Sequence, residues 1–364
     1  MTTHVFIVNE NTFPAHLEYM FAGTSSGEQD NNISLLADIK RVRAGDRVIF
    51  YFEGVGFYGI FKIKKNIDSD GKQIVYYDKD NFCNGRLKKK LLYRVFIEPE
   101  EVYSQPIDEW DALEKLPDNP RDIIWSLIYR KLKGGRGCTP VTPKEANKLV
   151  ELIRNKNNRK FLDPAGGFSW EKGKIIKTDS SFQYDKSKAN IPNIEKIIYR
   201  KRRVETYLQA YFSENAGLKK FDNTFFAQIC GKSNEIDWIG NEVFCGVGMQ
   251  KIDIFTIVNS PNRGFRLIEL KTVIDLGICY QLERYVKWSL EYLNGSENGT
   301  KPENLYPTIV LPKPSENNEE DTDKLSKILL PKFNSEFKAK CQPVKYFEYE
   351  FDKDKKIVFS EKKY

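Results

Sequence analysis

The sequence of 364 residues predicts an α+β protein of two domains: a strand-rich first domain with helices, and a second whose mixed sheet is flanked by helices. The length exceeds what one ordinary hydrophobic core accommodates. Hydrophobic content of 40% and aromatic content of 13% are typical of a globular chain. The segment 156–193 is polar and irregular, so we expect domains at 1–155 and 194–364 joined by a linker at 156–193.

Short runs of alternating or aromatic residues define the first domain. They predict strands at 4–9, 45–54, 56–65 and 89–99, and the glycine turn between the middle two predicts a hairpin. Helical periodicity predicts helices at 33–42, 120–132 and 142–155. The last should begin with a capping box, because Thr142 precedes Pro143 and Glu145 follows three residues after Thr142.

The second domain follows an order of helix, three strands, helix, strand and helix. This order predicts a mixed sheet with helices on its faces. The expected elements are a long helix at 193–215, strands at 236–246, 250–258 and 265–273, an amphipathic helix at 279–295, a strand at 306–312 and a helix ending near 337.

Charge and residue usage restrict the function. The net charge is +7, and short basic runs at 85–90, 129–137 and 199–203 predict a polyanionic partner. Only two histidines occur, His4 and His16, which argues against histidine-dependent nucleases and most zinc hydrolases. Six scattered cysteines without a C-x-x-C pair suit reduced thiols. No long apolar run or secretory signal is present, so we expect a cytoplasmic protein without a membrane span.

Three charged residues, Asp253, Glu269 and Lys271, interrupt two runs that otherwise predict buried strands. Because side chains alternate along a strand, Glu269 and Lys271 should share one face, and pairing of the strands can bring Asp253 close to Glu269. Two neighbouring carboxylates are costly unless a cation neutralises them. Mg²⁺ fits this requirement, with Mn²⁺ as a substitute, since it binds a few carboxylate oxygens and then substrate phosphate.

The pattern Asp253…Glu269-Leu270-Lys271 resembles the PD-(D/E)xK nuclease superfamily, with Gln250 and Lys251 at the loosely kept first position. The resemblance covers about 193–312. It implies a restriction-endonuclease-like fold, Asp253 and Glu269 as metal ligands with the Leu270 carbonyl as a third, and Lys271 orienting or deprotonating the attacking water.

Two further features resemble the RecB-like and NucS-like members of this superfamily. Gln281 and Tyr285, four residues apart on a predicted helix, match a Q-x-x-x-Y element that contacts nucleic acid near the metal. Glu205 could be an additional metal ligand, although an intrahelical partner for Lys201 or Arg202 is an equal alternative. The adjacent cations Arg200, Arg202 and Arg203 could bind the DNA backbone.

The first domain resembles PUA-like barrels, including EVE and YTH domains, through Gly45-Asp46 before one strand and Gly59-Ile60 in the next. The resemblance implies a nucleic-acid reader that can hold a modified base. The aromatic residues that could line such a pocket are better explained by core packing: Phe13, Tyr19, Phe21, Tyr51 and Tyr58. A second expected contact with nucleic acid is a basic, glycine-rich segment with Arg130, Lys131, Lys133 and Arg136.

These features predict a magnesium-dependent DNA endonuclease of restriction type that acts on double-stranded DNA, with or without modified bases. Cutting both strands needs two active sites, so we expect a homodimer. One alternative is a repair nuclease for mismatched or branched DNA. A second is a non-catalytic PUA-type protein that binds RNA or DNA.

Overall fold

The computed structural model describes residues 1–24, 34–77, 91, 93–113, 126, 137–184, 194–201, 204–245, 250–259, 264–292, 301–315 and 318–364. The chain forms two compact units, Met1–Ile191 and Pro192–Tyr364. Most of the predicted helix at 120–132 and the basic runs at 85–90 and 129–136 lie outside the described residues.

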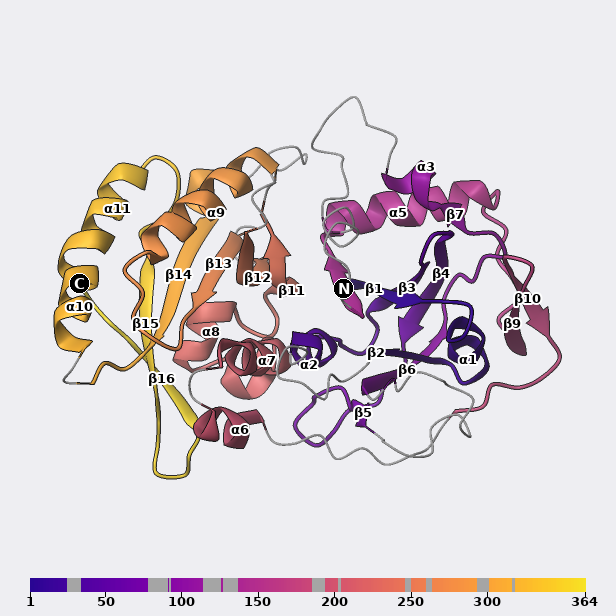
Figure 1. The fold of residues 1–364 in the computed structure, drawn as a ribbon, viewed down its shortest axis with the longest axis horizontal. Helices are drawn as coiled ribbons and strands as arrows, with labels where there is room; N and C mark the ends of the chain where they lie inside the picture. Colours follow the sequence, from indigo (N-terminus) through magenta and orange to yellow (C-terminus); the bar gives the residue numbers. More distant parts are fainter. Residues whose placement is uncertain are drawn as a thin grey trace. The chain divides into compact units, whose positions relative to one another are not determined.

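The first unit is built on a mixed sheet with helices packed against it (Figure 1). Its elements are β1 (Thr3–Val8), α1 (Phe13–Glu18), β2 (Phe21–Thr24), α2 (Ser34–Lys40), β3 (Arg47–Phe52), β4 (Gly56–Ile63), β5 (Tyr76–Tyr77), β6 (Tyr93–Pro99), β7 (Ile107–Asp108), α3 (Glu109–Leu113), β8 (Cys138–Val141), α5 (Pro143–Lys156), β9 (Gly167–Glu171) and β10 (Lys174–Thr178).

The main sheet of the first unit runs in the order β2-β6-β4-β3-β1-β8, with β5 beside β6 and β7 beside β4. Strands β3 and β4 pair antiparallel, so the predicted hairpin is confirmed. Strand β1 runs parallel to β3 and antiparallel to β8. Among the described residues no pairing between β2 and β8 closes the sheet into a hydrogen-bonded barrel.

The Gly45-Asp46 turn is fixed by the Asp46 carboxylate. Gly45 has a φ of +82°, a left-handed conformation that glycine adopts without strain. Asp46 then accepts hydrogen bonds from the amides of Thr2 (2.9 Å) and Arg43 (3.0 Å) and from Nε2 of His4 (2.8 Å). This turn therefore ties the start of the chain to the entry of β3.

Helix α5 begins as the sequence predicts. Thr142 is extended at the N-cap and its hydroxyl accepts the Glu145 amide, while the Glu145 carboxylate accepts the Thr142 amide at 2.8 Å. The capping box is confirmed. The buried face of α5 carries Leu149 and Ile153, which pack with Ile49 from β3 in one apolar cluster.

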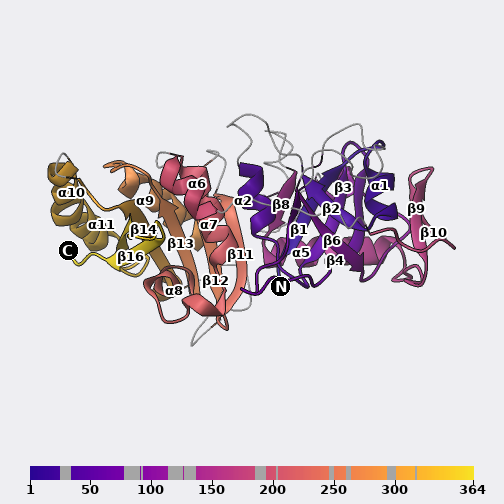
Figure 2. The ribbon, with the colours of Figure 1, turned by 90° about the horizontal axis from the view of Figure 1, so that it is seen from below.

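The expected linker is a structured part of the first unit, at least as far as residue 184. Strands β9 and β10 form an antiparallel hairpin beside α1 (Figures 1 and 2). Trp170 of β9 stacks on Phe52 with ring centroids 4.9 Å apart, and Tyr58 donates a hydrogen bond to the Gly173 carbonyl (2.8 Å). Lys172 and Gly173 both have positive φ, which suits a tight hairpin turn. The polar composition of the segment concealed this local pattern.

Core packing accounts for the five aromatic residues considered for a base pocket. Phe13, Tyr19, Phe21, Tyr51 and Tyr58 are each at most 8% exposed. We therefore assign no base pocket to them.

The second unit is a six-stranded mixed sheet with helices on both faces. Its elements are α6 (Ile194–Arg200), α7 (Glu205–Asn215), η4 (Lys219–Phe221), α8 (Phe225–Cys230), β11 (Ile236–Phe244), β12 (Lys251–Val258), β13 (Gly264–Leu270), α9 (Ile278–Tyr292), η6 (Pro302–Asn304), β14 (Leu305–Pro312), α10 (Glu319–Lys324), the π-helical turn η8 (Leu325–Leu329), α11 (Leu330–Phe337), β15 (Lys345–Phe351) and β16 (Ile357–Glu361).

Figure 1 shows the strands of the second unit side by side in the order β11-β12-β13-β14-β15-β16. Strands β11, β12 and β13 are antiparallel, whereas β14 runs parallel to β13 and β15. Phe255 and Leu267 pack with residues of α9 and α11 in one apolar core. Their neighbours Ile254 and Ile268 project to the opposite face, where α7 and α8 contact the sheet. This architecture agrees with the predicted α/β arrangement of the second domain.

The predicted helix at 193–215 is wrong as a single element, because it is interrupted before Glu205. Val204 is extended, with φ −104° and ψ 96°, and α7 starts at the next residue. Val204 is β-branched and follows four consecutive cations, which disfavour a continuous helix. The break places the Glu205 carboxylate in the first turn of α7, where the helix dipole stabilises a negative charge.

Two broader expectations can be compared with the described residues. No helix among them is both long and apolar enough to cross a membrane. The five described cysteines are free thiols, and all except Cys279 are buried.

Candidate active site

The candidate site lies where β12 and β13 separate. The ladder between them ends at Ile254 and Ile268, so the next opposed residues are Asp253 and Glu269. Beyond that point the Leu270 amide donates to Oδ2 of Asp253 at 2.8 Å instead of to the neighbouring backbone. Asp253 and Glu269 are 6% and 1% exposed. The structure therefore brings two predicted site residues together in a buried position.

Different helices hold the two carboxylates. Gln209 of α7 donates to Oδ1 of Asp253 from Nε2 at 2.9 Å. The Tyr285 hydroxyl of α9 lies 2.9 Å from Oε2 of Glu269 and 2.6 Å from the Lys251 carbonyl. The face of β13 that carries Glu269 is thus covered by α9.

Lys271 provides a positive charge beside these acids. Its Nζ forms an ion pair with Oε1 of Glu269 and lies 3.7 Å from Oε2 of Glu205. Glu205 therefore faces the cluster.

Burial and mutual repulsion raise the carboxyl pKa values of the cluster. Burial raises the pKa of Asp253 well above its ordinary value, and the nearby charges of Glu269 and Glu205 raise it further. Burial also raises the pKa values of Glu269 and Glu205, although Lys271 opposes both shifts. For Lys271 itself burial lowers the pKa, but Glu269, Asp253 and Glu205 outweigh it and the net shift is upward. Lys271 is therefore an ammonium group at neutral pH.

Sequence reasoning gave no role in the site to three of its polar neighbours. Gln209 orients Asp253 from 44 positions away in the chain, a contact that carries no local signal. The register of β11 and β12 places Glu242 opposite Asp253. Oε2 of Glu242 forms an ion pair with Nζ of Lys251 at 3.0 Å. The opposite charges of Glu242 and Lys251 in adjacent predicted strands could have suggested this pair.

The donor set suits a hard divalent cation that takes few of its ligands from the protein. Three carboxylates, from Asp253, Glu269 and Glu205, face the single ammonium of Lys271, so an added positive charge would stabilise the cluster. Among the described residues no three His, Cys, Asp or Glu side chains form a ready-made metal cage. Mg²⁺ does not need one, because it binds through one or two carboxylates and keeps water or phosphate in other positions.

The predicted nucleic-acid contacts have mixed outcomes. Tyr285 is 2% exposed and its hydroxyl is engaged at Glu269, so it positions the carboxylate rather than presenting a surface. Gln281 is partly buried, and its Oε1 has no hydrogen-bond partner among the described atoms. Arg200 is exposed at the end of α6. The remaining predicted cations lie outside the described residues: Arg130, Lys131, Lys133, Arg136, Arg202 and Arg203.

No protein-family model and no curated protein matches the chain. Solved structures with partial similarity include a protein from Rhodopseudomonas palustris (17% identity, 42% of this chain and 93% of that one, TM-score 0.28). A protein from Agrobacterium tumefaciens has 17% identity, covering 45% of this chain and 100% of its own, with TM-score 0.28. Human THYN1, solved with DNA containing 5-methylcytosine, has 13% identity, covering 42% of this chain and 98% of its own, with TM-score 0.27. TM-scores of this size carry no argument about fold or function.

Proposed function

We propose that the second unit is a magnesium-dependent phosphodiester hydrolase that cuts DNA. The proposal depends on one observation: Asp253 and Glu269 oppose each other where β12 and β13 part, with the Lys271 ammonium beside them. Asp253, Glu269 and the Leu270 carbonyl would hold the ion. When bound, Mg²⁺ would neutralise the carboxylates and polarise a phosphate oxygen.

The roles of the protein side chains follow from their contacts. The neighbouring carboxylates raise the pKa of Lys271, so its ammonium can stabilise charge that develops on the phosphate and orient the attacking water. Gln209 and Tyr285 fix the two carboxylates in place. In the reaction a water oxygen bonds to phosphorus as the bond from phosphorus to the leaving oxygen breaks, and solvent carries the proton that the water loses to the leaving oxygen.

We further propose that the first unit is a PUA-like reader that selects the site on double-stranded DNA. The net charge of +7 favours a polyanionic partner, and the anchored Gly45-Asp46 turn agrees with the resemblance. A second copy of the chain would supply the active site for the other strand. A restriction role requires discrete cuts in ordinary or modified duplex.

The test is digestion of methylated, unmethylated and mismatched duplexes by the full chain with Mg²⁺. Glu269→Gln should lower cleavage about a hundredfold or more while DNA binding remains. Glu283→Gln is the matched control, since Glu283 lies on α9 and pairs with Lys287. Undiminished cleavage by Glu269→Gln would remove the site assignment. Cleavage confined to mismatched duplex would replace the restriction role with repair.

A further inference from the structure

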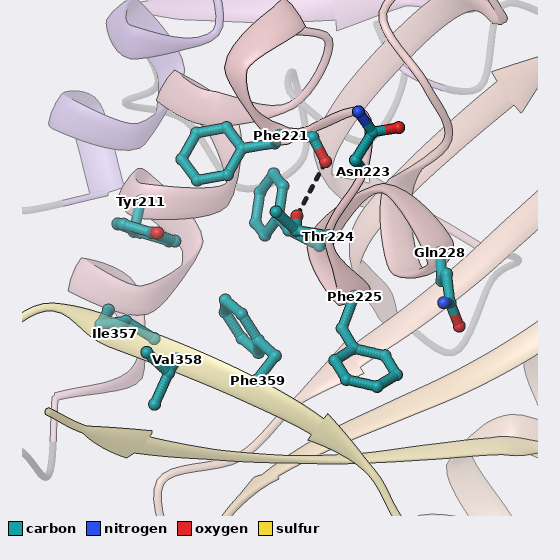
Figure 3. A pocket seen from close by; sticks show the side chains of 10 residues that line it. Tyr211, Phe221, Asn223, Thr224, Phe225, Gln228, Ile357, Val358 and Phe359 are labelled. Atoms are coloured by element: carbon teal, nitrogen blue, oxygen red, sulfur yellow. Dashed lines mark hydrogen bonds between the residues drawn. The ribbon is translucent and has the colours of Figure 1, made fainter.

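A pocket elsewhere in the second unit has no part in the proposed chemistry. It is a pocket of about 320 Å³ between α7, α8 and β16 (Figure 3). Tyr211, Phe226 and Phe359 form its wall and pack against one another, with ring centroids 5.6 Å apart for Phe226–Phe359 and 5.7 Å for Tyr211–Phe226. Phe225 stands at the rim and is 39% exposed. The pocket is therefore an aromatic slot that opens to solvent.

The rim adds groups that can recognise a polar ring edge. Asn223 and Gln228 are exposed, and their side chains make no hydrogen bond within the described residues. A carboxamide can donate and accept at once, so these two can match the edge of a heterocycle. The Thr224 hydroxyl is already engaged, because it donates to the Phe221 carbonyl at 2.7 Å (Figure 3).

Cations flank the pocket on two segments. Lys219 and Lys220 lie in η4 directly before Phe221, and Lys355 and Lys356 directly precede β16. All four are exposed. Two acids lie near these cations: the Asp222 carboxylate accepts the amide and hydroxyl of Ser233 and is attracted to Lys219, and Asp352 accepts the amides of Asp354 and Lys356. An aromatic slot between cations matches a base attached to a phosphate backbone.

Helix α7 links this pocket to the candidate active site. Glu205 is its first residue and Tyr211 follows six positions later, about 9 Å along the helix axis. The same helix therefore contributes a carboxylate to the candidate site and an aromatic ring to the pocket.

We propose that this pocket binds one unstacked nucleobase of the strand engaged at the candidate active site. The inference rests on the proposed function for its choice of nucleic acid. The base would lie against Phe225 and Phe359, with Asn223 and Gln228 at its polar edge and the lysines on the adjoining phosphates.

The test compares binding of two probes to the full chain in EDTA: a short single-stranded DNA of mixed sequence, and an abasic strand of equal length. Phe225→Ala should weaken binding of the base-bearing strand about tenfold and leave the abasic strand unchanged. Phe225→Trp keeps a ring and should restore the affinity. Ile328→Ala, which removes a side chain that is 59% exposed on η8, is the control and should behave as the unmodified chain.

Equal affinity of Phe225→Ala and the unmodified chain for the base-bearing strand would overturn the inference. A change in oligomeric state without a change in DNA binding would also overturn it, since the pocket would then receive a protein side chain. The binding test needs no cleavage, so its outcome is separate from that of the proposed function. If the chain does not cleave DNA but its affinity depends on Phe225, only the hydrolase proposal is rejected.

Discussion

Tyr285 tests the candidate site without removing any charge from it. Its hydroxyl lies 2.9 Å from Glu269 and 2.6 Å from the Lys251 carbonyl, and the ring is buried, so Tyr285→Phe removes these two polar contacts and little packing. Groups that orient a metal-binding carboxylate usually affect activity about 10- to 100-fold. We expect that loss in the cleavage rate at fixed Mg²⁺. Tyr280→Phe, on the exposed side of α9, is the control. A rate equal to that of the unmodified chain would show that Tyr285 has only a packing role.

His16 predicts a pH dependence of stability in the first unit. The ring is fully buried, Nδ1 lies 2.8 Å from the Phe21 carbonyl, and burial lowers its pKa to about 4. Between that value and about 6.5 the unfolded chain binds a proton that the folded chain does not, so stability falls as pH falls through this window. Across the whole window the unfolding free energy should fall by about 3 kcal/mol.

Urea unfolding of the chain and of His16→Gln between pH 7 and pH 4 measures this effect. The difference between their unfolding free energies should shrink as the pH falls, because both chains keep His4 and only the unmodified chain has His16, whose pKa burial lowers. Parallel curves would contradict the assignment.

At the scale of elements, the capping box of α5 gives a prediction about stability. Thr142→Ala removes the acceptor for the Glu145 amide and should lower the unfolding free energy by about 1 kcal/mol. Thr142→Ser keeps the hydroxyl and should retain most of the cap's contribution to the unfolding free energy. Urea unfolding compares the two. Equal losses for Ala and Ser would mean that the lost methyl group, and not the cap, is responsible.

The elements that the sequence predicted are those with a strong local signal. The β3–β4 hairpin, α5, β12, β13 and α9 combine clear periodicity with a turn or a cap at their ends. The break before α7 was missed because no glycine or proline marks it in the sequence. Strands β15 and β16 were outside the predicted set, and their many charged residues conceal a sheet edge.

The residues of the candidate site also differ in whether the local sequence could predict them. Asp253, Glu269 and Lys271 were predictable because charges in buried β-branched runs are unusual. Gln209 and the covering position of α9 depend on packing between elements that are distant in the chain. Local pattern cannot encode such contacts.

At the scale of the whole molecule, the second unit has the core of an independent domain. Its main apolar cluster is formed entirely by residues between Trp238 and Tyr346, within Pro192–Tyr364. A fragment 192–364 should therefore unfold cooperatively and keep Mg²⁺-dependent cleavage.

If the first unit selects the site, the fragment should cut at many more positions than the full chain. Mapping the ends produced by both on the same genomic DNA tests this division of labour. Identical end patterns would assign selection to the second unit, and a fragment that does not fold would refute its independence.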